Sequence, residues 1–216
     1  MGTSAERGTR GRILAIAEAE LAESGYHGAR LHRIAERVGV QKASLFHYFP
    51  SKDQLYRAVV EEGLDETEQT IRRALDAPGS PREKVRLLIE AYVDMVAEHP
   101  ARARILLRQS LGDAPEGHQQ SPDAQRLLSA VAAFIAEGQR AQIFARIDPV
   151  ALVLDVVGMV AFFFTSAHVL APAWGGAQGS VARSDRIKRH VVEVIERCLG
   201  LGQPQRAAAP PLAANG

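Results

Sequence analysis

Cysteine is almost absent from this sequence, with Cys198 the one example among 216 residues. A single cysteine excludes an internal disulfide framework and any cysteine-rich metal site. The N-terminus carries Arg7, Arg10 and Arg12 with no apolar run behind them, which is not the pattern of a signal peptide. We therefore expect a reducing, cytoplasmic location, and we expect neither a bound metal nor a cofactor.

An excess of charge of one sign is also lacking, because 26 Lys and Arg stand against 25 Asp and Glu, a net charge of +1. The balance is uneven along the chain. Residues 1–60 hold nine Lys and Arg against six Asp and Glu, so this part is +3 and the remainder is −2. A mildly basic N-terminal part fits nucleic-acid binding at that end, although the total charge alone does not argue for it.

Long hydrophobic runs are limited to one segment, 150–171, which is about long enough to cross a bilayer. Asp155 lies inside this segment and would cost about 3 kcal/mol near a bilayer centre. No Lys or Arg cluster flanks the segment closely. We therefore expect a buried helix of a helical core or dimer interface, and no association with a membrane.

Strand signals are nearly absent, whereas apolar residues recur at helical spacing along most of the chain. Gly25, Gly39, Pro50 and the segment 78–81 are typical stop signals between these stretches. The sequence predicts an all-α chain of about nine helices, three short and about six longer. The predicted helices cover about 12–24, 31–38, 41–49, 52–77, 82–99, 101–111, 123–142, 148–172 and 184–199.

The spacing of residues 31–49 is that of a helix-turn-helix, two short helices joined by a tight turn with one glycine. Gly39 stands where the chain must reverse sharply, a position that commonly needs a positive φ. The rest of the third helix is polar or aromatic and rich in hydrogen-bond donors, which suits phosphates and base edges. The packed wedge between the two helices is predicted to consist of Ile34, Ala35, Val38 and Leu45.

Two stretches, RIAERVGV at 33–40 and SLFHYFPSK at 44–52, resemble the tetracycline-repressor (TetR) family of bacterial transcription regulators. The resemblance is dense over about 12–60 and extends to the rest of the chain only as architecture. It implies a three-helix DNA-binding domain joined by a fourth helix to a helical domain that binds a ligand and forms a dimer. The expected division is a flexible basic arm at 1–11, a helix-turn-helix domain at 12–57, a ligand-binding and dimerisation domain at 58–200, and a disordered tail at 201–216.

By position in the family motif, the resemblance implies that Lys42, Ala43 and Phe46 face the bases of double-stranded DNA. Of these, Lys42 is the strong hydrogen-bonding reader, because Ala43 and Phe46 offer only apolar contact. Arg30 stands where the family usually has a hydroxyl residue and is expected to form a salt link with phosphate. The remaining expected contacts are to the DNA backbone, from Gln41, Ser44, His47, Tyr48 and Lys52.

The resemblance also implies a ligand pocket in the second domain and a homodimer formed through about 148–172 and 184–199. Aromatic and methionine side chains at helical spacing can line a cavity, but such side chains are more often ordinary core. The ligand is expected to be a small apolar or aromatic effector. The candidate pocket residues are Tyr92, Met95, His99, Phe134, Met159, Phe162, Phe163 and His168.

The function that these features predict is a ligand-responsive transcription regulator, a repressor that a mostly apolar molecule releases from a palindromic operator. Such a protein is associated with the nucleoid when it is bound to DNA. The sequence has no nucleotide-binding loop, no HExxH and no nucleophile motif, so we do not expect an enzyme. The alternative is a helical dimeric interaction protein whose helix-turn-helix does not bind an operator.

Overall fold

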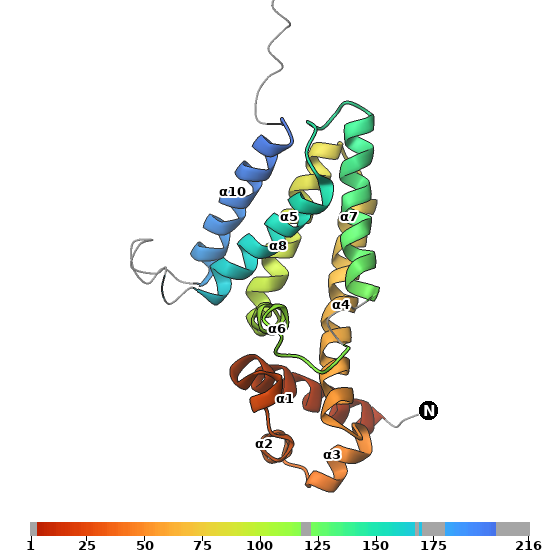
Figure 1. Ribbon diagram of the computed structural model, residues 1–216, viewed down its shortest axis with the longest axis vertical. Helices are drawn as coiled ribbons and strands as arrows, with labels where there is room; N and C mark the ends of the chain where they lie inside the picture. The colour runs from red at the N-terminus through yellow and green to blue at the C-terminus, as the bar shows by residue number, and fades with distance from the viewer. Residues whose placement is uncertain (1–3, 118–121, 167–168, 170–179, 202–216) are drawn as a thin grey trace, which may run out of the picture.

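The computed structural model describes residues 4–117, 122–166, 169 and 180–201. These residues form nine α-helices and no strand, which confirms the prediction of an all-α chain. Figure 1 shows α1 to α3 gathered at one end of the molecule, with the remaining helices stacked beyond them. The helices are α1 (Ser4–Gly28), α2 (Leu31–Val38), α3 (Lys42–Tyr48), α4 (Lys52–Asp76), α5 (Pro81–Glu98), α6 (Pro100–Ser110), α7 (Pro122–Arg140), α8 (Pro149–Thr165) and α10 (Ser180–Cys198).

The turn between α2 and α3 has the conformation that the glycine predicted. Gly39 has a φ of 78° and ends α2, and its N–H donates to the carbonyls of Ala35 and Glu36. This left-handed conformation costs a residue with a Cβ free energy that glycine does not lose. The reversal brings Leu45 of α3 onto Ile34 and its neighbours on α2, where both side chains are fully buried.

The N-terminal boundary of α1 corrects the expectation of a flexible arm at 1–11, because the helix already begins at Ser4. Arg10, within the expected arm, and Arg12, next to it, contact the ends of α2 and α3 instead. The guanidinium carbon of Arg10 lies 5.3 Å from the ring centroid of Phe49, and Arg12 Nη2 donates to the Val38 carbonyl at 2.6 Å. These contacts attach the start of α1 to the C-terminal ends of α2 and α3.

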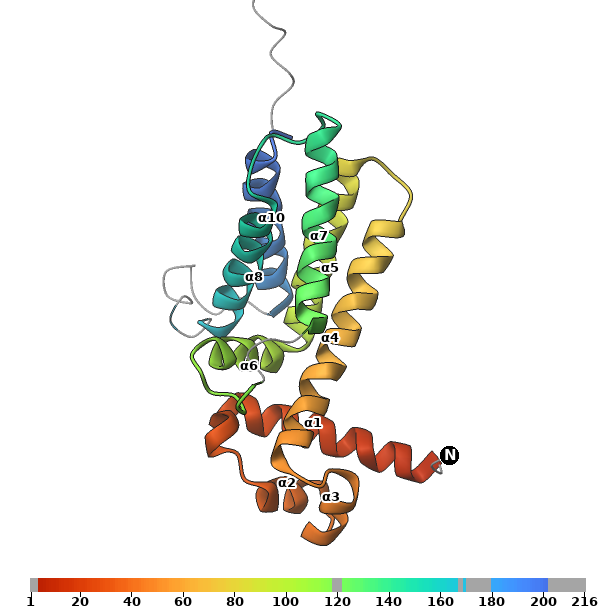
Figure 2. The same ribbon diagram turned by 45° about the vertical axis from the view of Figure 1, so that its right-hand side comes forward.

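Helix α4 passes from one part of the molecule to the other without interruption. Ser51 caps its N-terminus, with Oγ accepting from the Gln54 N–H at 3.1 Å. Leu55, Tyr56 and Val59 on its first turns are buried in the core formed with α1, α2 and α3. Beyond them α4 packs against α5 and α7, as Figure 2 shows. The predicted boundary between 57 and 58 therefore falls inside a continuous helix.

The second core is formed by α5, α6, α7, α8 and α10, with Val93, Val160, Ile187 and Leu199 among its fully buried members. Helix α8 begins behind Asp148, whose carboxylate accepts from the Val150 and Ala151 N–H groups. It ends at Thr165, earlier than the predicted end at 172, and the predicted tail beyond 201 lies outside the described residues. Within the described part of the chain, no helix is both long and apolar enough to cross a membrane.

Candidate functional site

Helix α3 presents most of its surface to solvent at the end of the molecule farthest from α10 (Figure 1). Of the side chains expected at DNA, Arg30, Gln41, Lys42, Ala43, Ser44 and His47 are exposed, whereas Phe46, Tyr48 and Lys52 are partly buried. Leu45 and Phe49, on the other side of the helix, are buried in the core of the N-terminal helices. This division leaves the polar side of α3 free to approach another molecule while its apolar side fixes the helix in place.

Lys42 occupies the first turn of α3, and its Nζ lies 5.6 Å from the centroid of the Phe46 ring. The contact holds the ammonium group over an aromatic face, a weak attraction at an exposed site. His47 and Tyr48 meet edge to face, with centroids 5.8 Å apart. The face of α3 therefore combines one cation with aromatic rings, and Lys42 is its one long hydrogen-bond donor that is fully exposed.

Lys52 is less available for a phosphate than the sequence suggested. Its Nζ donates to the His27 carbonyl at 3.2 Å and lies 4.9 Å from the centroid of the Tyr26 ring. Burial lowers the pKa of Lys52, while the carboxylates of Asp113 and Asp53 act in the opposite direction. The ammonium group thus holds the end of α1 against the start of α4, and a contact with DNA would have to compete with these interactions.

Glu20, which the sequence analysis did not single out, has a buried carboxylate that joins α1 to α2. The Glu20 side chain on α1 is 0% exposed, with Arg33 Nη1 at 3.3 Å and Arg37 Nη1 at 3.5 Å from its two oxygens. Both arginines belong to α2, where they are one helical turn apart. A signal was present in the sequence: Glu20 continues the apolar phase of Ile13 and Ala17, where a charge needs a partner.

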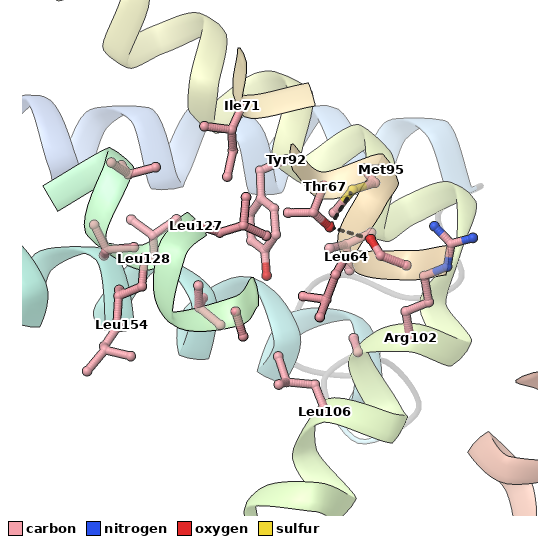
Figure 3. A pocket seen from close by; sticks show the side chains of 18 of the residues that line it. Leu64, Thr67, Ile71, Tyr92, Met95, Arg102, Leu106, Leu127, Leu128 and Leu154 are labelled. Atoms are coloured by element: carbon pink, nitrogen blue, oxygen red, sulfur yellow. Dashed lines mark hydrogen bonds between the residues drawn. The ribbon is translucent and has the colours of Figure 1, made fainter. Parts of the chain in front are cut away.

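A cavity of about 780 Å³ lies in the second part of the molecule, lined by residues of α4, α5, α6, α7, α8 and α10. This volume is within the range of pockets that bind small organic ligands. Its walls are mostly aliphatic, and Figure 3 shows Leu64, Leu106, Leu127 and Leu128 arranged around it, with the Tyr92 hydroxyl directed into the space. Tyr92 and Met95 are the two predicted pocket residues that line this cavity.

Five of the predicted pocket residues lie elsewhere, because residue type and helical spacing do not determine which neighbour a helix face meets. Phe134 packs edge to face on Phe144, and Phe163 does so on His190 of α10. Met159 packs against the second core, Phe162 is 56% exposed, and His99 Nε2 lies 3.9 Å from Glu66. His168 lies outside the described residues. No group of His, Cys, Asp or Glu in the described ranges is arranged to hold a metal ion.

The wall of the cavity formed by α6 also contacts the N-terminal helices. Arg102 lines the cavity and forms ion pairs with Glu18 of α1, at 3.0 Å, and with Glu66 of α4. The bond from Arg102 holds the pKa of Glu66 below its usual value. One side chain therefore links the cavity wall to two helices that belong to the first core.

A second contact between α6 and α1 lies farther along α6, beside the kink in α1. Gly25 has φ 71° and ψ 176° and leaves the helical path there. Arg108 donates to the carbonyls of Glu23, at 2.8 Å, and Ala22, and it pairs with Asp113. The Asp113 carboxylate accepts from the His27 N–H at 3.1 Å and lies where a Cβ at Gly25 would be. The end of α6 and the turn behind it thus hold the C-terminal end of α1.

Comparisons with known proteins match the N-terminal helices and the remaining helices to two separate family models. Residues 13–59 match the family described as bacterial regulatory proteins, tetR family, and residues 81–195 match the tetracyclin repressor-like C-terminal domain. The transcriptional activator FasR of Mycolicibacterium smegmatis is 35% identical over 98 residues, which cover 45% of this chain and 44% of FasR. The transcriptional regulator RutR of Escherichia coli K12 is 27% identical over 87% of this chain and 86% of RutR.

A solved structure has the same fold. The crystal structure of AibR in complex with isovaleryl coenzyme A and operator DNA superposes with a TM-score of 0.66 at 17% identity. The superposition covers 84% of this chain and 97% of AibR. The relatives are named as regulators of transcription, which agrees with the expectation that the chain is not an enzyme.

Proposed function

Because this chain belongs to the TetR family of bacterial regulatory proteins, we propose that it is a homodimeric transcription regulator that a mostly apolar ligand releases from a palindromic operator. The observation that carries the proposal is the pairing of two features in one chain. The polar face of α3 is exposed, while its apolar side packs into the core of the helix-turn-helix. A cavity of about 780 Å³ lies in the second part of the molecule, and helix α6 both lines this cavity and packs against α1.

At the operator, α3 enters the major groove of double-stranded DNA and Lys42 is the principal reader of base edges. A lysine ammonium suits the O6 and N7 acceptors of guanine, while Ala43 and Phe46 can meet only apolar groups such as a thymine methyl. Arg30, Gln41, Ser44, His47 and Tyr48 contact the DNA backbone, and Lys52 joins them if it leaves the His27 carbonyl. Specificity then depends on few hydrogen bonds and more on apolar contact and DNA shape.

The dimer forms through α8 and α10, which lie side by side in both views (Figures 1 and 2). Helix α8 exposes a large apolar side chain that a monomer leaves in water, because Phe162 is 56% exposed. A second copy related by a twofold axis covers the same face on both partners. The two α3 helices then reach successive major grooves about 34 Å apart, which is why the operator is a palindrome.

Ligand binding acts on DNA binding through α6. A molecule seated against Arg102 and Ala103 shifts a helix whose Arg102 and Arg108 hold Glu18 and the end of α1. Such a shift changes the separation of the two α3 helices in the dimer, so the liganded form loses affinity for the operator. We infer release and hence repression. The protein works in the cytoplasm, associated with the nucleoid while it is bound to DNA.

The proposal is tested by selecting duplexes from a random library with the full chain and measuring affinity for the selected duplex by fluorescence anisotropy. Lys42→Ala is expected to lose about 1–3 kcal/mol on the selected duplex and little on a random one. His32→Ala on the exposed surface of α2 is the matched control and is expected to leave both affinities within a factor of two. Selection of no preferred sequence at low salt would instead favour a helical interaction protein that does not bind an operator.

A further inference from the structure

The cavity is elongated along α4 and α5. Its α4 wall runs from Val59 to Ile71, about 18 Å at the rise of an α-helix, and its α5 wall runs from Val85 to Val96. Most of the lining side chains between these ends are aliphatic. The cavity therefore has the shape and the surface for an extended hydrocarbon chain rather than for a compact polar molecule.

Tyr92 provides a polar group in the middle of the α5 wall of this cavity, and the other polar side chains of the lining are Thr67, Arg102, Gln109, Ser110 and Gln125. Its hydroxyl points into the cavity in Figure 3, and among the described residues it has no hydrogen-bond partner. Burial raises the pKa of Tyr92 to about 12, so the hydroxyl keeps its proton and can donate it. Thr67 nearby differs, because its hydroxyl already donates to the Gly63 carbonyl at 2.7 Å. An oxygen acceptor in the ligand would give the Tyr92 hydroxyl the bond that it lacks.

The charge at the cavity wall argues against an anionic ligand. Arg102 is the one charged side chain among the residues that line the described cavity. It already faces two carboxylates, those of Glu18 and Glu66, so this group of three carries a net negative charge. A ligand carboxylate would have to leave water and approach this cluster without a free cation, which is costly in an apolar site.

We propose that the cavity binds an uncharged, extended apolar molecule with a carbonyl oxygen that accepts a hydrogen bond from the Tyr92 hydroxyl. The regulatory role of this ligand rests on the proposed function, whereas its binding in the cavity does not. The class includes esters, thioesters and ketones of aliphatic chains. It excludes the free fatty acids of the same length at neutral pH.

The test uses methyl octanoate and octanoate as matched probes, titrated into the full chain at pH 8 by calorimetry. Methyl octanoate is expected to bind the unaltered protein, and octanoate at least about tenfold more weakly. Tyr92→Phe is expected to weaken methyl octanoate about 3–10-fold, the loss of one hydrogen bond. Tyr26→Phe removes a hydroxyl outside the cavity and is expected to leave this affinity unchanged. Equal melting temperatures of the Tyr92→Phe and unaltered proteins show that packing is retained.

Tighter binding of octanoate than of its ester, equal affinity of Tyr92→Phe and the unaltered protein for the ester, or binding of neither probe would overturn the inference. The role in regulation is measured separately, by the effect of methyl octanoate on affinity for the selected duplex. Ester binding that depends on Tyr92 but leaves DNA affinity unchanged supports the inference about the ligand while contradicting the proposed release from the operator.

Discussion

Glu20 is a single buried side chain that affects the position of helix α3. Its carboxylate is fully buried on α1, and both of its ion-pair partners, Arg33 and Arg37, belong to α2. Since α2 packs directly on α3, the arginines fix the helix against which α3 rests. Both arginines keep nearly half of their side-chain surface in water, so the pair is buried on one side only.

Replacing Glu20 with Gln is expected to lower the free energy of unfolding by about 1–3 kcal/mol, because two charge-assisted contacts are lost while the shape is kept. Glu23→Gln, at an exposed position on the same helix, is the control and should change stability by less than about 0.5 kcal/mol. Urea unfolding followed by circular dichroism measures both. Equal midpoints for Glu20→Gln and the unaltered chain would show that the buried charge contributes nothing.

Single residues were also where sequence reasoning was weakest. The phases of the helices predicted that Leu45 is core and that Lys42 is exposed, since neighbours in a helix-turn-helix are close in sequence. The lining of the cavity comes instead from six helices spread over residues 59–195. Phe162 and Phe134 were therefore chosen by residue type, and the structure places one on the surface and the other against Phe144.

At the scale of elements, α1 is longer and more firmly attached than a mobile arm would be. Gly11 lies inside it and is exposed, with no atom near the position of a Cβ. Gly39 is also open around its Cβ position, but its φ of 78° is left-handed. The two glycines therefore separate the effect of helical conformation from that of a positive φ, with no clash at either site.

Alanine at these two positions is expected to change stability in opposite directions. Gly11→Ala should raise the free energy of unfolding by about 0.5–1 kcal/mol, as in a helix interior. Gly39→Ala should lower it by about 1–2 kcal/mol, the cost of a left-handed residue with a Cβ. Thermal and urea unfolding of both variants provide the comparison. No gain from Gly11→Ala would mean that the start of α1 is not helical in solution.

Helix α6 lines the cavity and also holds the C-terminal end of α1 through Arg108. Arg108→Ala removes the donors to the Glu23 and Ala22 carbonyls and should lower the free energy of unfolding by about 1–3 kcal/mol. We also expect a smaller effect of methyl octanoate on operator affinity. Arg104→Ala, at an exposed position on the same helix, should change neither quantity. Loss of stability in Arg108→Ala with a full ligand response would assign the transmission of the signal to another contact.

At the scale of the whole molecule, the apolar face of α8 requires a partner. Phe162→Glu places a charge in that face and is expected to yield a monomer in size-exclusion chromatography with light scattering, with operator affinity reduced about tenfold or more. Leu111 follows α6 and is 87% exposed, so Leu111→Glu is the control that should remain dimeric. A dimeric Phe162→Glu protein would move the interface to another face.

The continuous course of α4, from the first core to its contacts with α5 and α7, has a consequence for exchanging parts between relatives. Each inserted residue turns everything on one side of the insertion by about 100° relative to the other side, because a helix has 3.6 residues per turn. A chimera that combines the DNA-binding helices of one relative with the ligand-binding helices of another must therefore keep the rotational phase of α4 across the junction. A junction with one residue too many or too few would leave both parts of each chain folded, but the two α3 helices of the dimer would point away from each other on the DNA.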